Sequence, residues 1–261
     1  MHMKTRLFIL FLTISFAAQA QEKKPLFVND QKLLPVLFQQ YSAEYRALCY
    51  QAFNIAELRL EQATKKKKKR LAIITDLDET ILDNSYSEAQ GLKEGYGFSP
   101  ASWKKWTDRS AATAVPGAVA FLQLAKKKGV SIYYISNRDN SEVQSTLRNL
   151  QQLELPDADT AHILFVKTTS SKEERRLAVM QTHTVIMLLG DNLNDFTQVF
   201  EKGSIENRFL ETDNARAEWG KKFIVLPNPS YGEWENALSG YRRGLSREQK
   251  DSTYYQLLKG F

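Results

Sequence analysis

The stretch Leu71-Ala-Ile-Ile-Thr-Asp76-Leu-Asp78-Glu-Thr-Ile-Leu-Asp83-Asn84 decides the fold of this sequence. Its first five residues form a short apolar run with β-branched members, which is typical of a strand buried on both faces. Asp76 and Asp78 follow at once, so their carboxylates would lie at the mouth of a buried strand. Desolvation there is costly without a partner, and a cation would be a suitable one. The alternative is that both aspartates only cap the following turn.

Similar short runs recur along the chain and predict four more strands: 130–135, 163–166, 184–189 and 223–226. Between them, helical stretches are predicted over 117–128, 141–152, 171–181 and 195–201. Strands that alternate with helices indicate an α/β fold with a parallel sheet, right-handed crossovers and helices on both faces. In such folds ligands bind at the carboxyl ends of the strands, so the chemistry is expected there.

The strand over 184–189 ends in a second pair of carboxylates, Asp191 and Asp195. We expect Asp191 to face the Asp76 site and Asp195 to begin a helix behind it. Hard oxygen ligands of this kind suit Mg²⁺, which also retains waters and binds phosphate. Asp195 could equally cap its helix, and both roles are compatible.

Two further strand ends carry groups that suit an anion. Ser136, Asn137 and Arg138 precede a helix near Ser141, and Lys172 lies in the first turn of another helix. A hydroxyl beside a helix N-terminus can bind an anion, although capping explains the same pattern. Together the four strand ends supply carboxylates, a hydroxyl and a lysine, which are the parts that phosphoryl transfer requires.

The segment 76–85 closely resembles the first motif of the class C nonspecific acid phosphatases, a bacterial lipoprotein acid phosphatase and 5′-nucleotidase family of the haloacid dehalogenase (HAD) superfamily. Gly190-Asp-Asn-Leu-Asn-Asp195-Phe resembles the last motif of that family. Further matches follow the family's order: Ser42-Ala-Glu-Tyr45, Trp103-Lys-Lys-Trp106, Pro116-Gly-Ala118, Ser136-Asn-Arg138, Ser171-Lys172 and Asn228-Pro-Ser-Tyr231-Gly. The resemblance covers nearly all of the chain after residue 20 and implies a HAD-like, Rossmann-type sheet.

The resemblance also implies roles for individual residues. Asp76 would be the nucleophile and a Mg²⁺ ligand, and Asp78 the general acid and base whose backbone carbonyl also binds the metal. Asp191 would be the other carboxylate ligand, whereas Asp195 would orient a metal-bound water without contacting the ion. Ser136 and Lys172 would hold the phosphate, with Asn137 as an additional contact.

The stretch 85–115 breaks the strand and helix rhythm and is rich in aromatic residues, so we predict a small cap insertion over the mouth of the site. The resemblance implies that Trp103 from this cap and Tyr231 near the C-terminal end flank the ring of a substrate. A flat aromatic clamp suits a nucleobase, because each stacking contact contributes roughly 1–3 kcal/mol. For Trp106 we favour core packing.

The first twenty residues have the pattern of a secretory signal peptide. Lys4 and Arg6 precede the apolar run 7–18, and Ala18-Gln-Ala20 provides a small-x-small cleavage site. We therefore expect one domain over 21–261, exported to the periplasm or secreted. An uncleaved anchor is the alternative. Family members are usually lipid-anchored through a cysteine after the leader, but the only cysteine of the chain is Cys49, so lipid attachment is not expected.

Before the first strand, apolar residues recur at helical spacing over 33–63, which predicts one long amphipathic helix or two in series. We expect the apolar stripe to cover the sheet and to bury Cys49. The stripe comprises Leu34, Leu37, Phe38, Tyr41, Tyr45, Leu48, Ala52, Ile55 or Ala56, and Leu60. The basic run Lys65–Arg70 is interpreted as a solvated connection.

The sequence thus predicts a Mg²⁺-dependent acid phosphatase for small phosphate monoesters, including nucleoside 5′-monophosphates. Two alternatives stay open: a phosphotransferase that uses the same aspartyl phosphate, and a non-catalytic nucleotide- or porphyrin-binding surface protein. No nucleic acid polymer and no transmembrane segment of the mature chain are expected. A homo-oligomer is left open.

Overall fold

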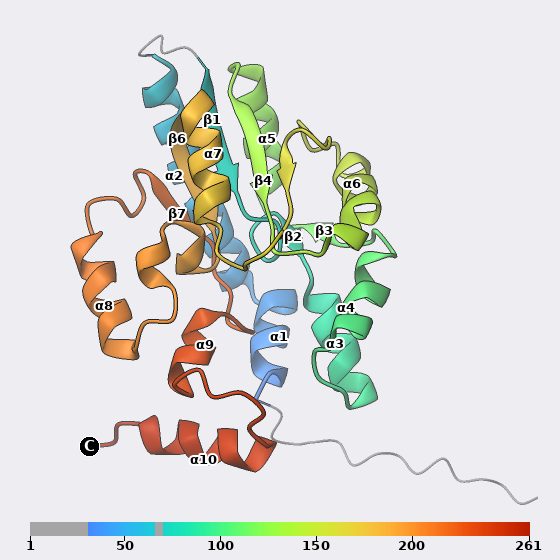
Figure 1. The fold of residues 1–261 in the computed structure, drawn as a ribbon, viewed down its shortest axis with the longest axis vertical. Coiled ribbons are helices and arrows are strands. Elements are labelled where there is room, and N and C mark those ends of the chain that lie inside the picture. The colour runs from blue at the N-terminus through green and yellow to red at the C-terminus, as the bar shows by residue number, and fades with distance from the viewer. Residues whose placement is uncertain (1–30, 66–69) are drawn as a thin grey trace, which may run out of the picture.

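A computed structural model describes residues 31–65 and 70–261 (Figure 1). Its centre is a five-stranded parallel sheet with the order β5-β4-β1-β6-β7. The strands are β1 (Leu71–Thr75), β4 (Ser131–Ile135), β5 (Ile163–Leu164), β6 (Thr184–Gly190) and β7 (Phe223–Val225). The predicted α/β fold and all five predicted strands are confirmed, although β5 and β7 are shorter than the apolar runs that contain them.

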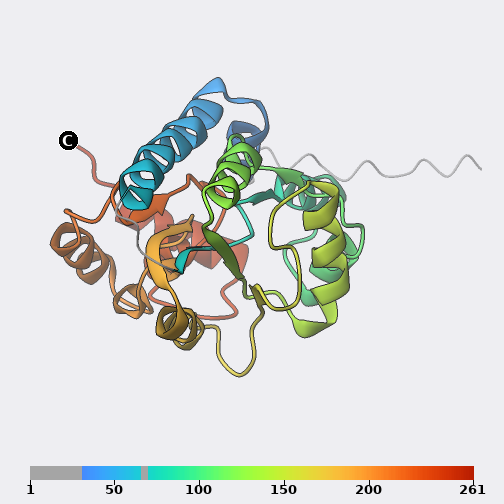
Figure 2. The same ribbon diagram turned by 90° about the horizontal axis from the view of Figure 1, so that it is seen from above.

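Helices cover both faces of this sheet. Helices α2 (Ala43–Thr64) and α5 (Ala118–Lys127) lie on one side, and α7 (Glu173–Thr182) lies on the other (Figures 1 and 2). Successive residues of β1 point to opposite faces: Ile73 joins the core with α2 and α5, whereas Ile74 joins a smaller cluster with Val179 of α7. Burial on both faces explains why β1 is apolar throughout.

The predicted N-terminal helix is two helices in series, α1 (Leu33–Tyr41) and α2. Ser42 separates them with an extended backbone, and its hydroxyl accepts the N–H groups of Glu44 and Tyr45 at 3.1 and 3.2 Å. In α2 the expected stripe is buried except at Leu48, which is exposed; Cys49 is buried too, and burial raises the pKa of its thiol to about 11.

The other half of that stripe was wrongly predicted. In α1, Leu34, Leu37, Phe38 and Tyr41 are exposed, whereas Val36 and Gln39 are buried. The cause is the interruption at Ser42, after which α2 does not continue the direction of α1. Helix α1 therefore packs against α3 (Ser85–Glu94) instead of the sheet.

The segment predicted as a cap folds as α3, α4 (Pro100–Thr107) and β3 (Thr113–Ala114). Strand β3 pairs antiparallel with β2 (Leu82–Asp83), just after the end of β1. Figure 1 shows α3 and α4 below the carboxyl ends of the central strands. The insertion thus lies on the side of the sheet where ligands are expected.

Helix α6 (Val143–Gln152) follows a 3₁₀ turn, η1 (Asn140–Glu142), in agreement with the predicted helix over 141–152. The predicted helix over 195–201 is wrong. Two 3₁₀ turns, η2 (Leu193–Asp195) and η3 (Gln198–Phe200), take its place. A capping box between Asn192 and Asp195 closes η2, and Thr197, between the two turns, has an extended backbone. Among the described residues outside the insertion, three helices were not predicted: α8 (Ile205–Asn214), α9 (Glu233–Leu238) and α10 (Arg247–Leu257).

Two predicted features lie wholly or partly outside the described residues: the signal peptide, and positions 66–69 of the basic run. Among the helices of residues 31–65 and 70–261, none combines the length and the apolar composition that a membrane span requires.

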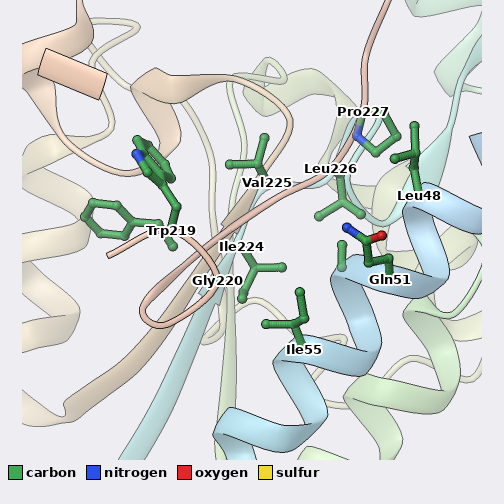
Figure 3. Close-up of a pocket in the computed structure, with 11 residues that line it drawn as sticks. Leu48, Gln51, Ile55, Trp219, Gly220, Ile224, Val225, Leu226 and Pro227 are labelled. Atoms are coloured by element: carbon green, nitrogen blue, oxygen red, sulfur yellow. The ribbon is translucent and has the colours of Figure 1, made fainter. Parts of the chain in front are cut away.

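A groove of about 310 Å³ lies between α2 and the edge strand β7 (Figure 3). Its lining is largely apolar: Leu48, Gln51, Ala52, Ile55, Trp219, Gly220, Phe223, Ile224, Val225, Leu226 and Pro227. None of the predicted site residues belongs to this lining, so the candidate site is separate from the groove.

Candidate active site

The end of β1 places Asp76 and Asp78 at the edge of the sheet. The N–H of Asp76 donates to the carbonyl of Leu189 at 3.0 Å, which continues the pairing with β6 by one residue. A tight turn follows, in which Glu79 takes a left-handed backbone with φ of 59°. Three N–H groups of this turn, from residues 80 to 82, donate to the carbonyl of Leu77. The turn therefore fixes the backbone positions from which the side chains of Asp76 and Asp78 extend.

The end of β6 brings Asp191 and Asp195 to the same edge. Asp191 accepts hydrogen bonds from Thr80 Oγ1 at 3.1 Å and from Asn228 Nδ2 at 2.8 Å. Asp195 is the third residue of η2 and not a helix N-cap; Asn192 is the cap, and its N–H donates to Asp195 Oδ2 at 3.0 Å. Gly190 permits this arrangement, because a Cβ there would lie 2.4 Å from the Cβ of Asp195.

Lys172 links the two carboxylate pairs. Its Nζ lies 2.5 Å from Asp76 Oδ1 and 2.6 Å from Asp195 Oδ1, and its side chain is 8% exposed. Lys172 immediately precedes α7, and this helix lies on the face of the sheet opposite α2 and α5. The structure thus brings together residues from three strand ends that are separated by up to 119 positions in sequence (195 − 76).

The electrostatics of this cluster fit a bound cation. One oxygen each from Asp76, Asp191 and Asp195 lies within 4.8 Å of the others. Burial, followed by the charge of Asp195, raises the pKa of Asp191 to about 7. Burial also raises the pKa of Asp76 well above its ordinary value, which Lys172 opposes and the other aspartates reinforce. Three carboxylates thus face one ammonium, and a divalent ion would balance the remaining charge.

Burial alone would lower the pKa of Lys172, but Asp195 and Asp76 raise it overall. The ammonium is therefore charged at neutral pH. It provides a fixed positive charge beside the Asp76 carboxylate.

Asp78 has different partners from Asp76. The guanidinium of Arg138 donates to it from Nη2 at 2.7 Å and from Nε at 3.1 Å. The side-chain amide of Asn84 donates at 2.9 Å, and the hydroxyl of Ser136 lies at 3.5 Å. Burial alone would lower the pKa of Arg138, but Asp78 raises it overall, so the guanidinium of Arg138 keeps its positive charge. The two aspartates of the first motif therefore lie in separate surroundings, two residues apart.

Two of the predicted phosphate contacts, Ser136 and Asn137, have different surroundings. Ser136 is fully buried beside Asp78, and its Oγ accepts the N–H of Arg138 at 3.1 Å. The Asn137 side chain instead holds the loop before α7: Nδ2 donates to Ser170 O at 2.8 Å, and Oδ1 accepts from Arg175 Nη2 at 2.6 Å. These two contacts use one N–H and one lone pair of the amide, so its second N–H is left for an added contact.

Of the two predicted aromatic clamp residues, Trp103 contacts Arg138 after β4, and Tyr231 contacts the turn after β1. The ring of Trp103 lies 5.5 Å from the guanidinium carbon of Arg138, and the hydroxyl of Tyr231 donates to the buried carboxylate of Glu79. Trp106 packs against the main core as expected, and its Nε1 also donates to Asn84 Oδ1 at 2.8 Å. The aromatic clamp stays a prediction.

Sequence reasoning did not assign Thr80, Asn84, Asn228, Arg138 or Glu79 to the site. All five occur in the quoted motifs, so the sequence identified the segments that contain them. Their contacts depend on side-chain directions in the turn after β1 and on the approach of residue 228 to residue 191. No spacing rule provides these.

Comparison with known proteins agrees with this site. The family model "HAD superfamily, subfamily IIIB (Acid phosphatase)" matches residues 16–234. The class B acid phosphatase of Enterobacter sp. (strain 638) is 24% identical over 154 residues, which cover 56% of this chain and 65% of the relative. The class B acid phosphatase of Morganella morganii is 21% identical over 215 residues, which cover 79% and 86%.

Solved structures give a stronger match. The class C acid phosphatase from Bacillus anthracis is 41% identical with a TM-score of 0.85, and the match covers 88% of this chain and 98% of that chain. A structure of the same enzyme with tungstate bound gives the same values. The resemblance to class C enzymes and the HAD-like fold are thereby confirmed. This chain belongs to subfamily IIIB of the HAD superfamily, the acid phosphatases.

Proposed function

We propose that this protein is an acid phosphatase that hydrolyses small phosphate monoesters through an aspartyl phosphate on Asp76, with Mg²⁺ as cofactor. One observation carries the proposal: three carboxylates and the Nζ of Lys172 converge at the carboxyl edge of the sheet. The family membership and the 41% identity to a class C acid phosphatase support it. Tungstate, an oxyanion of phosphate-like shape, is bound in one structure of that relative.

In the proposed reaction, each step is assigned to a residue of the site. A carboxylate oxygen of Asp76 attacks phosphorus, and the bond from phosphorus to the leaving oxygen breaks while Asp78 donates a proton to that oxygen. Water then attacks the aspartyl phosphate, Asp78 takes a proton from it, and the Asp76 carboxylate is restored. Lys172, and Ser136 through its hydroxyl, hold the oxygens of the transferring group.

The carboxylates of Asp76 and Asp191, with the backbone carbonyl of Asp78, would hold Mg²⁺. The bound ion supplies charge neutralisation at the phosphate oxygens and a fixed orientation of the phosphoryl group. Asp195 is suited to a supporting role, because Lys172 and the N–H of Asn192 already occupy its two oxygens.

The raised pKa values predict how Mg²⁺ affects stability. The pKa of Asp191 is about 7 in the folded, metal-free protein and is ordinary when the chain is unfolded. Its stabilising contribution is therefore present below about pH 4 and is lost as pH rises through 7. Mg²⁺ binds the ionised form, so we expect MgCl₂ to raise the melting temperature more at pH 8 than at pH 5.5. Thermal melts of EDTA-treated protein, with and without added MgCl₂ at each pH, measure this. In Asp191→Asn the difference between the two pH values should shrink. An equal Mg²⁺ effect at both pH values would contradict it.

Nucleoside 5′-monophosphates are the proposed substrates. The support is that each aromatic residue contacts a neighbour of Asp78: Trp103 lies against Arg138, and the Tyr231 hydroxyl donates to Glu79. A panel of nucleotides, sugar phosphates and aryl phosphates tests this on the purified protein. We expect the highest kcat/KM for nucleotides, and a loss of about tenfold or more in Trp103→Ala for nucleotides alone, as removal of a stacking contact implies. Equal loss across the panel would contradict a base-binding role.

Two other functions give different results in the same assays. A purely binding protein would show no Mg²⁺-dependent release of phosphate from p-nitrophenyl phosphate, with or without EDTA. A phosphotransferase would pass phosphate to an added nucleoside, which product analysis detects. Hydrolysis is favoured because the matching family model and the 41% identical solved structure are both of acid phosphatases.

We also propose that the protein is exported and cleaved after Ala20. The support is the basic, apolar and small-residue pattern of the first twenty positions. N-terminal sequencing of the protein from cell fractions is expected to begin at Gln21. A sequence that starts at Met1 in a membrane fraction would instead indicate an uncleaved anchor.

A further inference from the structure

We propose that Arg138 and Asn84 are positioning residues that anchor one carboxyl oxygen of Asp78, so that the other oxygen exchanges the proton with the leaving group. This inference rests on the proposed function, which makes Asp78 the general acid. It concerns a pair of residues that lie outside the nucleophile, metal and phosphate groups discussed above.

The two oxygens of Asp78 are held unequally. Oδ1 accepts from Arg138 Nη2 at 2.7 Å, from Asn84 Nδ2 at 2.9 Å and from Arg138 Nε at 3.1 Å. Oδ2 shares only the Nε donor at 3.1 Å and the hydroxyl of Ser136 at 3.5 Å. Hydrogen bonds saturate Oδ1, which therefore has no lone pair to spare for a proton. Oδ2 is the oxygen that gives a proton to the leaving group and later takes one from water.

The guanidinium of Arg138 is itself fixed. Its side chain is 2% exposed, and Nη1 donates to Thr146 Oγ1 at 3.0 Å. The N–H of Arg138 also donates to Ser136 Oγ at 3.1 Å. A buried, planar group with this many partners cannot swing to other positions without losing charged hydrogen bonds, so it defines the orientation of the Asp78 carboxyl.

Asn84 is fixed from the insertion. Trp106 Nε1, which can only donate, lies 2.8 Å from Asn84 Oδ1. The amide therefore turns its NH₂ group toward Asp78, and the same group lies 3.3 Å from a Glu79 oxygen. Trp103 lies against the guanidinium of Arg138 at 5.5 Å from the ring centre. Both tryptophans of α4 thus support the anchor: Trp106 holds Asn84, and Trp103 lies against Arg138.

Loss of the anchor should affect proton donation and leave the attack by Asp76 intact. Asp76 has its own partner in Lys172 and shares none with Asp78 among the contacts described. General acid catalysis contributes about 10²- to 10⁴-fold, and only where the leaving oxygen is basic. A displacement of about 1 Å can forfeit about 10²-fold. The expected signature is a rate loss that depends on the leaving group.

Arg138→Met and Trp106→Phe test the proposal at saturating Mg²⁺, with Arg148→Met as control because Arg148 is an exposed arginine of α6. For each protein, kcat and KM are measured with glycerol 2-phosphate, whose leaving alkoxide needs a proton, and with 2,4-dinitrophenyl phosphate, whose leaving phenolate does not. We expect kcat of Arg138→Met to fall about 10²-fold or more with glycerol 2-phosphate and less than about fivefold with the dinitrophenyl ester, at little changed KM. Trp106→Phe keeps an aromatic ring but removes the indole N–H. It should show the same dependence on the leaving group, with a smaller loss of kcat.

Each outcome decides the proposal. Equal losses on both substrates, or no loss on either, would overturn it, because a merely structural or phosphate-binding role does not distinguish the leaving groups. If Arg138→Met does not fold, Trp106→Phe carries the same test. Failure of the proposed function is a separate result: the wild-type protein would then hydrolyse neither ester.

Discussion

Replacing Asp76 with asparagine is expected to lower kcat by at least about 10⁴-fold, which corresponds to about 5.5 kcal/mol of activation free energy. The amide has nearly the shape of the carboxylate but cannot form the acyl phosphate, so the reaction loses its covalent route. The side chain lies beside Lys172, and burial holds its pKa well above the ordinary value in the metal-free protein. Removing the charge therefore should not lower the melting temperature in EDTA.

Steady-state hydrolysis of p-nitrophenyl phosphate measures this effect. Asp213→Asn is the matched control, since Asp213 is exposed on α8 and undergoes the same chemical change. Mass spectrometry of the Asp76→Asn protein guards against deamidation, which would restore the wild-type residue. Turnover within about tenfold of wild type in an intact variant would show that the nucleophile lies elsewhere.

Replacing Lys172 with methionine is expected to lower kcat/KM by about 10²- to 10³-fold, the usual effect of removing one group that stabilises charge in the transition state. Lys172 is the cation that lies between Asp76 and Asp195, at 2.5 and 2.6 Å. Without it, the negative charge of the transferring group meets uncompensated carboxylates. The same loss of positive charge should strengthen Mg²⁺ binding, because the ion then faces more net negative charge.

Calorimetric titration with MgCl₂ and steady-state kinetics together test this prediction. Lys167→Met is the control, because Lys167 is an exposed lysine five positions earlier in the same crossover. A fall in kcat/KM with unchanged or tighter Mg²⁺ binding supports the electrostatic role. Unaltered kcat/KM would mean that the phosphate does not approach Lys172.

Much of the fold follows from local patterns in the sequence. Ile73 and Ile74 point to opposite faces of β1 and are both buried, so the run 71–75 is apolar without alternation and was identified as a central strand. The carboxylates at 76 and 191 were placed together because parallel strands end at one edge. Lys172 was expected at the same edge, and the structure shows its Nζ against Asp76.

Other features depend on geometry that periodicity does not encode. The apolar residues of α1 fit a continuous stripe with α2, but the extended backbone of Ser42 turns the chain, and Leu34 and Tyr41 are exposed. Residues 195–201 have helical composition, yet the capping box between Asn192 and Asp195 closes a 3₁₀ turn instead. In that turn Asp195 points back toward Lys172.

The partners of Asp78 illustrate the same limit within the site. Arg138 was part of a quoted motif, but an arginine at a helix start is equally suited to solvent or phosphate. Its contact with Asp78 requires that β4 lie next to β1, that the turn after β1 direct Asp78 toward it, and that Thr146 of α6 hold the far side of the guanidinium. Only the assembled structure supplies all three.

The central claim is that one divalent ion and one phosphoryl group bind beside the Asp76 carboxylate. Anomalous diffraction from crystals soaked with MnCl₂ and tungstate tests it most directly, because manganese and tungsten are distinguished by wavelength. We expect manganese in contact with carboxylate oxygens of both Asp76 and Asp191, and tungstate oxygens in contact with Lys172 Nζ and Ser136 Oγ. Manganese bound away from either aspartate, or tungstate out of reach of the Asp76 carboxylate, would contradict the account.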